Sequence, residues 1–271
     1  MTNSVLHLQS LGAPGRYVFS ARPEFCVGPP GKAFLFGGAG LAAAIEAAGR
    51  TCGREVIWAT AQYLGYAPMG KTLDVRVSID AMGGSVTQAG VLLCEGGRQV
   101  LRVSAALGER PGQPMWQWEE MPAVPAPDGC VPAELWPRQG AGLLRTQLEI
   151  RIPAGATGAR TRDRTIEPTG RMQIWMRWHD GRLADAPLLA IFADTIPGCA
   201  AMALGRNQGG NSLDNTFRLR GLVAADWVLC DISVAAADRG FAHGDARLFA
   251  PDGTLMALAS QSLVLREVSR D

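Results

Sequence analysis

The chain has 271 residues, of which 47% are hydrophobic and 19% charged, and its formal net charge is +1. This length and hydrophobic content suit one large domain or two modules with packed cores, and they exclude a disordered or fibrous protein. No run of Lys or Arg is interleaved with aromatic residues, so the charge pattern typical of a nucleic-acid-binding protein is missing.

Cysteine and histidine usage argues against a metal site. The six cysteines are scattered without a CxxC pair, and the chain has only three histidines, so neither a metal nor a cofactor is predicted. The N-terminus lacks a basic stretch followed by an apolar core, and the longest apolar segment, residues 187–204, is interrupted by Asp194 and Pro197. We therefore expect a cytoplasmic protein with free core thiols and no membrane insertion.

The first half predicts one helix followed by a series of strands. An Ala-rich helix is expected at residues 38–48, and segments of strand character follow at residues 55–64, 72–80, 85–94 and 99–107. Residues 108–137 then gather prolines with little periodicity, which suits a connector. The expected organisation is an N-terminal module at residues 1–120, a linker at 121–142 and a C-terminal module at 143–271.

The second half repeats this order. A helix is predicted at residues 186–204, with strands at residues 212–219, 227–234, 240–249 and 254–265. The turn at residues 95–97 matches the turn at 251–253, and 253 − 97 gives an offset of 156. The same offset carries the first helix onto the second, which indicates an internal repeat. A helix of small residues allows a curved antiparallel sheet to wrap closely around it, and two such units can pair their sheets.

Two polar side chains stand out in the second half. Read as a regular strand, residues 212–217 place Ser212, Asp214 and Thr216 on one face, so Asp214 is either a functional carboxylate or a cap of the preceding turn. Gln261 shares its face with apolar residues, and a buried amide needs a partner, which is either a backbone group or a catalytic water. Ser233 lies in a strand between them. It is either an exposed polar residue without a function or a hydroxyl that helps to hold a water.

An ordered series of short motifs resembles the acyl-CoA thioesterase II (TesB-type) family, in which two hotdog modules occupy one chain. The motifs are residues 36–38 (FGG), 189–194 (LAIFAD), 212–214 (SLD), 226–229 (DWVL), 239–242 (RGFA), 252–255 (DGTL) and 259–261 (ASQ). The resemblance implies an α+β double hotdog, with each curved antiparallel sheet wrapped around a long central helix. It also implies a homodimer whose partner is an acyl-CoA substrate.

The same resemblance implies a site in which Asp214, Gln261 and a hydroxyl, assigned to Ser233, orient a nucleophilic water. By the repeat offset, the counterpart of Gln261 is Ala105 and that of Asp214 is Trp58, so one active site per chain is expected. The expected activity is hydrolysis of fatty acyl-CoA to free acid and CoA.

Substrate contacts are predicted at two places. Gly37 and Gly38 at the start of the first helix either offer free N–H groups to the thioester carbonyl or allow tight helix-to-sheet packing. Arg218 and Arg220 stand where the family has aromatic residues, and they either bind the CoA phosphates or form a solvated charge pair.

Two other functions remain open. A catalytically weak acyl-CoA-binding protein is one, because Asn215, Arg218 and Arg220 depart from the family pattern. An enoyl-CoA hydratase is the other, but His7, His179 and His243 do not follow an Asp at a short helical spacing.

Overall fold

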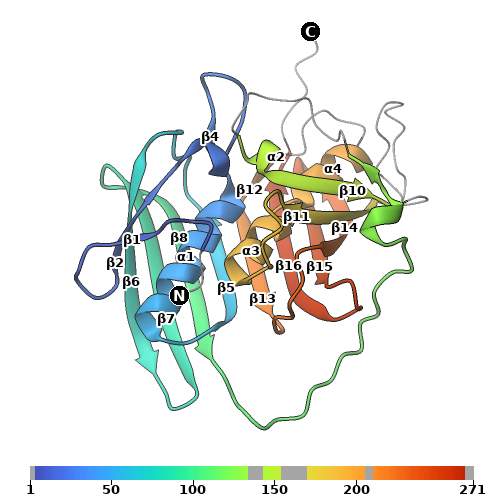
Figure 1. The fold of residues 1–271 in the computed structure, drawn as a ribbon. Helices are drawn as coiled ribbons and strands as arrows, with labels where there is room; N and C mark the ends of the chain where they lie inside the picture. The colour runs from blue at the N-terminus through green and yellow to red at the C-terminus, as the bar shows by residue number, and fades with distance from the viewer. Residues whose placement is uncertain (1–3, 134–142, 154–169, 205–209, 266–271) are drawn as a thin grey trace.

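The computed structural model describes residues 4–133, 143–153, 170–204 and 210–265. Two halves lie side by side and share one continuous sheet (Figure 1). The elements of the first half are β1 (Gln9–Ser10), β2 (Arg16–Ser20), η1 (Pro23–Phe25), β3 (Cys26–Val27), β4 (Phe34–Leu35), α1 (Gly37–Cys52), β5 (Val56–Tyr63), β6 (Thr72–Met82), β7 (Val86–Glu95) and β8 (Arg98–Gly108).

The second half repeats the order of a helix followed by a meander. Its elements are η2 (Pro127–Gly129), β9 (Val131–Pro132), α2 (Leu144–Gln147), β10 (Leu148–Ile152), β11 (Arg171–Trp178), α3 (Ala186–Ala193), α4 (Ile196–Ala203), β12 (Asn211–Ser212), β13 (Asp214–Leu219), β14 (Val228–Asp238), β15 (Phe241–Phe249) and β16 (Leu255–Val264). The predicted strands that follow each helix correspond to β5–β8 and β13–β16. The strands that extend the sheet at its two ends, such as β2 and β11, are not among the predicted elements.

The central helices are buried because their side chains are small or apolar. All residues of α1 from Gly38 to Ala48 are buried, and a Cβ added at Gly40 would lie 3.2 Å from Leu101 of β8. The helix can therefore sit directly against the concave face of its sheet, and α3 packs beside it at the centre of the molecule (Figure 1). The stretch Ala186–Ala203 is long and apolar enough to cross a membrane, but 72% of it is buried inside the protein, as in a core helix.

The single helix predicted at residues 186–204 is wrong in one respect, because it is interrupted between α3 and α4. Pro197 lies in the first turn of α4 and has no N–H to continue the hydrogen-bond ladder of α3. The hydroxyl of Thr195 donates instead to the carbonyl of Phe192 at 2.8 Å. Asp194 is the C-cap of α3 and therefore lies at the break.

The two halves are joined by antiparallel pairing of β5 with β13. In this pair Thr60 lies directly opposite Thr216, and their hydroxyl oxygens are 3.1 Å apart. Two residues related by a twofold axis can contact each other only where the axis passes between them. Thr60 and Thr216 are equivalent positions of the two halves, because 216 − 60 is 156. The repeat offset predicted from the sequence is therefore confirmed, and a pseudo-twofold axis passes between the two threonines.

A connector links the two halves. Residues 109–126 contain no helix or strand, and they cross the end of the second half (Figure 1). The side-chain amide of Gln117 holds the connector by donating to the carbonyl of Gly253 at 2.9 Å and accepting from the N–H of Leu255 at 2.8 Å. The predicted linker, residues 121–142, extends in part outside the described residues, so the predicted module boundaries stay a prediction.

Candidate active site

A buried carboxylate lies between the two halves. Asp194 is 3% exposed and accepts three hydrogen bonds from three separate elements. The backbone N–H of Gly38 in α1 donates to Oδ2 at 2.5 Å, the amide Nε2 of Gln261 in β16 donates to Oδ1, and the hydroxyl of Ser212 in β12 donates to Oδ1 at 3.4 Å. Since 194 − 38 is again 156, this contact also lies on the pseudo-twofold axis.

The start of α1 favours an anion at this place. The N-cap of α1 is Phe36, whose side chain cannot cap the helix, so the first N–H groups need acceptors from elsewhere. Asp194 of the second half supplies one acceptor, and the positive end of the helix dipole faces its charge. Glycine is needed here because a Cβ on Gly38 would lie 2.8 Å from the Cβ of Asp194.

Burial raises the pKa of Asp194 to about 6, and the hydrogen bonds from Gln261, Gly38 and Ser212 only partly oppose this effect. A carboxyl group of this pKa is largely ionised at neutral pH, yet it still binds a proton readily. These are the properties that a general base needs.

Two further polar groups lie in the same region. Asn215 of β13 is fully buried, and the hydroxyl of Tyr63 at the end of β5 is buried as well. Neither group makes a hydrogen bond of regular geometry within the described ranges. The Oε1 atom of Gln261 likewise has no hydrogen-bond partner there. Asn215 is nevertheless close enough to lower the pKa of both Asp194 and Tyr63. Unpartnered polar atoms therefore gather around the buried carboxylate.

A bulge at Leu213 decides which side chains of this strand reach the site. Ser212 lies opposite Leu263, whereas Thr216 lies opposite Ser260, so the register against β16 shifts by one residue between them. An extra residue reverses the alternation of the strand. Ser212 consequently faces inward, on the same side as Gln261, while Asp214 faces the outer surface.

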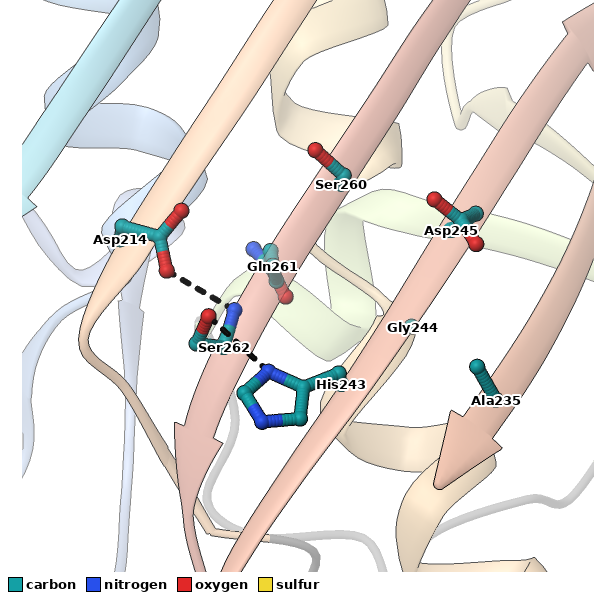
Figure 2. Close-up of a pocket in the computed structure, with 8 residues that line it drawn as sticks. All are labelled: Asp214, Ala235, His243, Gly244, Asp245, Ser260, Gln261 and Ser262. Atoms are coloured by element: carbon teal, nitrogen blue, oxygen red, sulfur yellow. Dashed lines mark hydrogen bonds between the residues drawn. The ribbon is translucent and has the colours of Figure 1, made fainter. Parts of the chain in front are cut away.

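The predicted pairing of Asp214 with Gln261 is therefore wrong in its geometry. In the β13–β16 register Asp214 falls opposite Ser262, and directly paired residues share a face, so Asp214 and Gln261 point to opposite sides of the sheet. Asp214 Oδ1 accepts the backbone N–H of Ser262 at 2.9 Å, next to the bulge (Figure 2). This contact is not the turn cap of the alternative interpretation either, because Ser262 belongs to β16 and not to the preceding turn.

Ser233 is also on the outer face. It lies opposite Asp245 of β15, which in turn lies opposite Ser260 of β16. Ser233 is thus two strands away from Gln261 and on the other side of the sheet, and the structure does not bring the two together. The outer face here is a shallow hollow of about 180 Å³, lined mainly by Asp214, His243, Asp245, Ser260 and Ser262 (Figure 2).

The predicted substrate-binding residues fall in two separate places. Gly37 and Gly38 start α1 as predicted and lie at the buried carboxylate, but the N–H of Gly38 is already bonded to Asp194. Arg218 is exposed on the outer face and lines a second hollow of about 270 Å³ together with Asp245 and Arg247. Arg220 follows the end of β13. A role of these two arginines in CoA binding stays a prediction.

The residues that the sequence prediction missed are Asp194, Ser212, Tyr63 and Asn215. Asp194 had a signal, because it is a charged residue inside an apolar helix and the repeat offset places it on Gly38. No signal in the sequence pointed to Tyr63, because its approach to Asp194 depends on how the two halves pair. Among the described residues, no group of three or more His, Cys, Asp or Glu side chains could hold a metal ion.

Comparison with known families and structures gives one consistent result. Residues 28–108 match the family described as "Acyl-CoA thioesterase N-terminal domain", and residues 127–265 match "Acyl-CoA thioesterase C-terminal domain". A search of curated proteins found no match.

Several solved structures are similar over nearly the whole chain. A protein of Novosphingobium aromaticivorans, provisionally named a thioesterase, is 36% identical, with a TM-score of 0.88 over 96% of this chain and 98% of that one. A TesB protein of Mycobacterium avium subspecies paratuberculosis is 21% identical, with a TM-score of 0.77 over 96% of both chains. The acyl-CoA thioesterase II TesB2 of Mycobacterium marinum is 22% identical, with a TM-score of 0.74 over 97% of this chain and 96% of that one. The last two establish the fold alone, and the predicted double hotdog is confirmed.

Proposed function

From the premise that the chain belongs to the acyl-CoA thioesterase family, we propose that it hydrolyses a fatty acyl-CoA to free acid and CoA, with Asp194 as general base. The observation that carries the proposal is the buried carboxylate of Asp194, whose pKa of about 6 suits a base at neutral pH. Gln261 keeps its predicted role in orienting the water. Asp194 replaces Asp214, and Ser212 replaces Ser233.

The proposed reaction needs no covalent intermediate with the enzyme. A water donates a hydrogen bond to Asp194, gives this proton to the carboxylate, and its oxygen attacks the thioester carbon. The carbonyl electron pair moves onto oxygen, returns as the C–S bond breaks, and the CoA thiolate takes the proton from Asp194. General base catalysis typically contributes about 10²–10⁴-fold to such a step.

Gln261 and Ser212 fix the base for this step. Both donate to Oδ1 of Asp194, while Gly38 occupies Oδ2. Their donation stabilises the ionised carboxylate, because hydrogen bonds to the charged form favour it. The Oε1 atom of Gln261, which makes no other bond in the described part of the chain, is free to accept a hydrogen bond from the water.

The alternative functions receive less support. A hydratase would need a histidine near the base, but none of the histidines is among the groups that shift the pKa of Asp194, and His243 lies on the outer face beside Ser262. A catalytically weak acyl-CoA-binding protein remains the second candidate because of Asn215. We also propose a cytoplasmic location, which cell fractionation would test. We further propose a homodimer, which size-exclusion chromatography with light scattering would test.

Release of thiol from a panel of acyl-CoAs from C2 to C16 tests the proposal. We expect thiol release from at least one chain length, and loss of this activity in Asp194→Asn. Thermal stabilisation by acyl-CoA without thiol release would instead identify a binding protein. Bleaching of the enoyl absorbance of crotonyl-CoA without free thiol would identify a hydratase.

A further inference from the structure

Tyr63 is the side chain of the first half that reaches the buried carboxylate. It is the last residue of β5, and a Cβ added at Gly37 would lie 3.0 Å from its ring, so the ring packs against the start of α1. Solvent reaches part of the residue, whereas its hydroxyl oxygen is buried. The hydroxyl thus points away from solvent, although the residue as a whole is only partly buried.

Within the described residues the hydroxyl has no hydrogen bond of regular geometry, although the side chain of Asn215 lies close enough to lower its pKa. Burial and the nearby charge of Asp194 raise the pKa of Tyr63 well above its ordinary value, so the phenol stays protonated at any working pH. A buried donor without a partner destabilises a protein, so its presence beside a functional carboxylate needs a reason.

We propose that the Tyr63 hydroxyl donates a hydrogen bond to the carbonyl oxygen of the thioester and stabilises the oxyanion that forms there. This inference rests on the proposed thioesterase function. When the water oxygen bonds to the thioester carbon, the carbonyl electron pair moves onto oxygen, and Tyr63 donates to that oxygen without transferring its proton. The hydrogen bond weakens again when the electron pair returns and the CoA thiolate leaves.

The start of α1 cannot fill this role through Gly38, because the N–H of Gly38 already donates to Asp194. A fixed neutral phenol in a buried site is an effective donor to the thioester oxygen. The base and the donor then come from different halves of the chain.

Pseudo-symmetry agrees with this division of roles. With the offset of 156, the counterpart of Tyr63 in the second half is Leu219, and the counterpart of Gln261 in the first half is Ala105. Neither counterpart can donate a hydrogen bond. The polar side chains of both halves therefore gather on one side of the axis, and the other side keeps no equivalent set.

The test compares Tyr63→Phe with Tyr17→Phe, which is a matched control. Tyr17 is also buried, but its hydroxyl bonds to Thr51 at 3.1 Å near the far end of α1. We expect Tyr63→Phe to lower kcat by about 10²–10³-fold with KM nearly unchanged, which is the loss expected for one oxyanion donor. Its thermal midpoint should equal or exceed that of the wild type. Tyr17→Phe should keep its kcat and lose stability.

Binding of two inert probes separates catalysis from packing. One probe is an S-alkyl-CoA without a carbonyl group, and the other is a CoA thioether that carries a trifluoromethyl ketone, whose hydrate mimics the tetrahedral adduct. Tyr63→Phe should bind the first as the wild type does and lose affinity for the second. Equal loss for both probes, or an unchanged kcat, would overturn the role of Tyr63. If the wild type itself releases no thiol from any acyl-CoA, the proposed function fails instead.

Discussion

Replacing Asp194 by asparagine should make the protein more stable and less active. The pKa of this carboxyl is about 6 in the folded protein, compared with an ordinary value of 3.8. The difference of about 2.2 corresponds to about 3 kcal/mol, since one pKa unit is about 1.4 kcal/mol. Ionisation of Asp194 above pH 6 therefore costs the folded state about 3 kcal/mol.

The sign of this effect follows from proton binding. Between pH 3.8 and about 6 the folded protein holds a proton on Asp194 that the unfolded chain has released, so the contribution to stability falls as pH rises. Asparagine keeps the shape but cannot ionise. Its oxygen can still accept from Gly38, and the Gln261 amide can turn so that Oε1 accepts from the new NH₂ group.

Urea denaturation at two pH values measures the effect. Asp194→Asn should gain up to about 3 kcal/mol at pH 7.5 and only about 0.6 kcal/mol at pH 4, while its thiol release falls by about 10²–10⁴-fold. A loss of stability at pH 7.5, or an equal gain at both pH values, would refute the argument that burial of this charge destabilises the fold. Unchanged turnover would refute its role as the base.

Four further results are expected. Asp214→Asn should change kcat by less than about threefold and lower the free energy of unfolding in urea by about 0.5–1.5 kcal/mol, because it weakens only an outer-face hydrogen bond from the N–H of Ser262. A hundredfold loss of kcat would restore Asp214 as the base. In the wild type, kcat/KM should fall about tenfold per pH unit below about pH 6, the pKa of Asp194, as a buffer series would record; a flat profile would argue against it. Gln261→Ala should move this limb to higher pH, because it removes a hydrogen bond that lowers the pKa of Asp194; an unmoved limb would mean that the amide does not act on the base. Gly38→Ala should lower the free energy of unfolding by about 1–3 kcal/mol and reduce thiol release, because the added Cβ would lie 2.8 Å from the Cβ of Asp194. Unchanged stability and activity would show that the start of α1 can shift to make room.

The fold was predictable because its signals are local or repeated. Alternation of apolar residues marks the strands, and small residues mark the central helix, so neither needs knowledge of the partner elements. The offset of 156 links the halves from sequence alone, and the paired threonines 60 and 216 bear it out. The break between α3 and α4 could also have been found, because Pro197 follows Asp194 within an apolar helix.

The site was only partly predictable, because it depends on strand register. The conclusion that Gln261 is a buried amide in need of a partner was correct, since the residue is 3% exposed and its Nε2 donates to Asp194. The choice of Asp214 assumed regular alternation from residue 212 to 216, and the bulge at Leu213 breaks it. One extra residue thus placed Ser212 and Asp214 on opposite faces of the sheet, which neither composition nor periodicity reveals.

The position of Asp194 on the pseudo-twofold axis gives a physical reason to expect one site per chain. On the axis a residue meets its own equivalent, so a symmetric pair of modules would place two carboxylates in contact. Two buried carboxylates this close cannot both ionise, and one would lose the charge that a base needs. The first half instead has Gly38 there, and its N–H donates to the carboxylate that the second half keeps. Duplication within one chain permits this difference, because each half can change without the other.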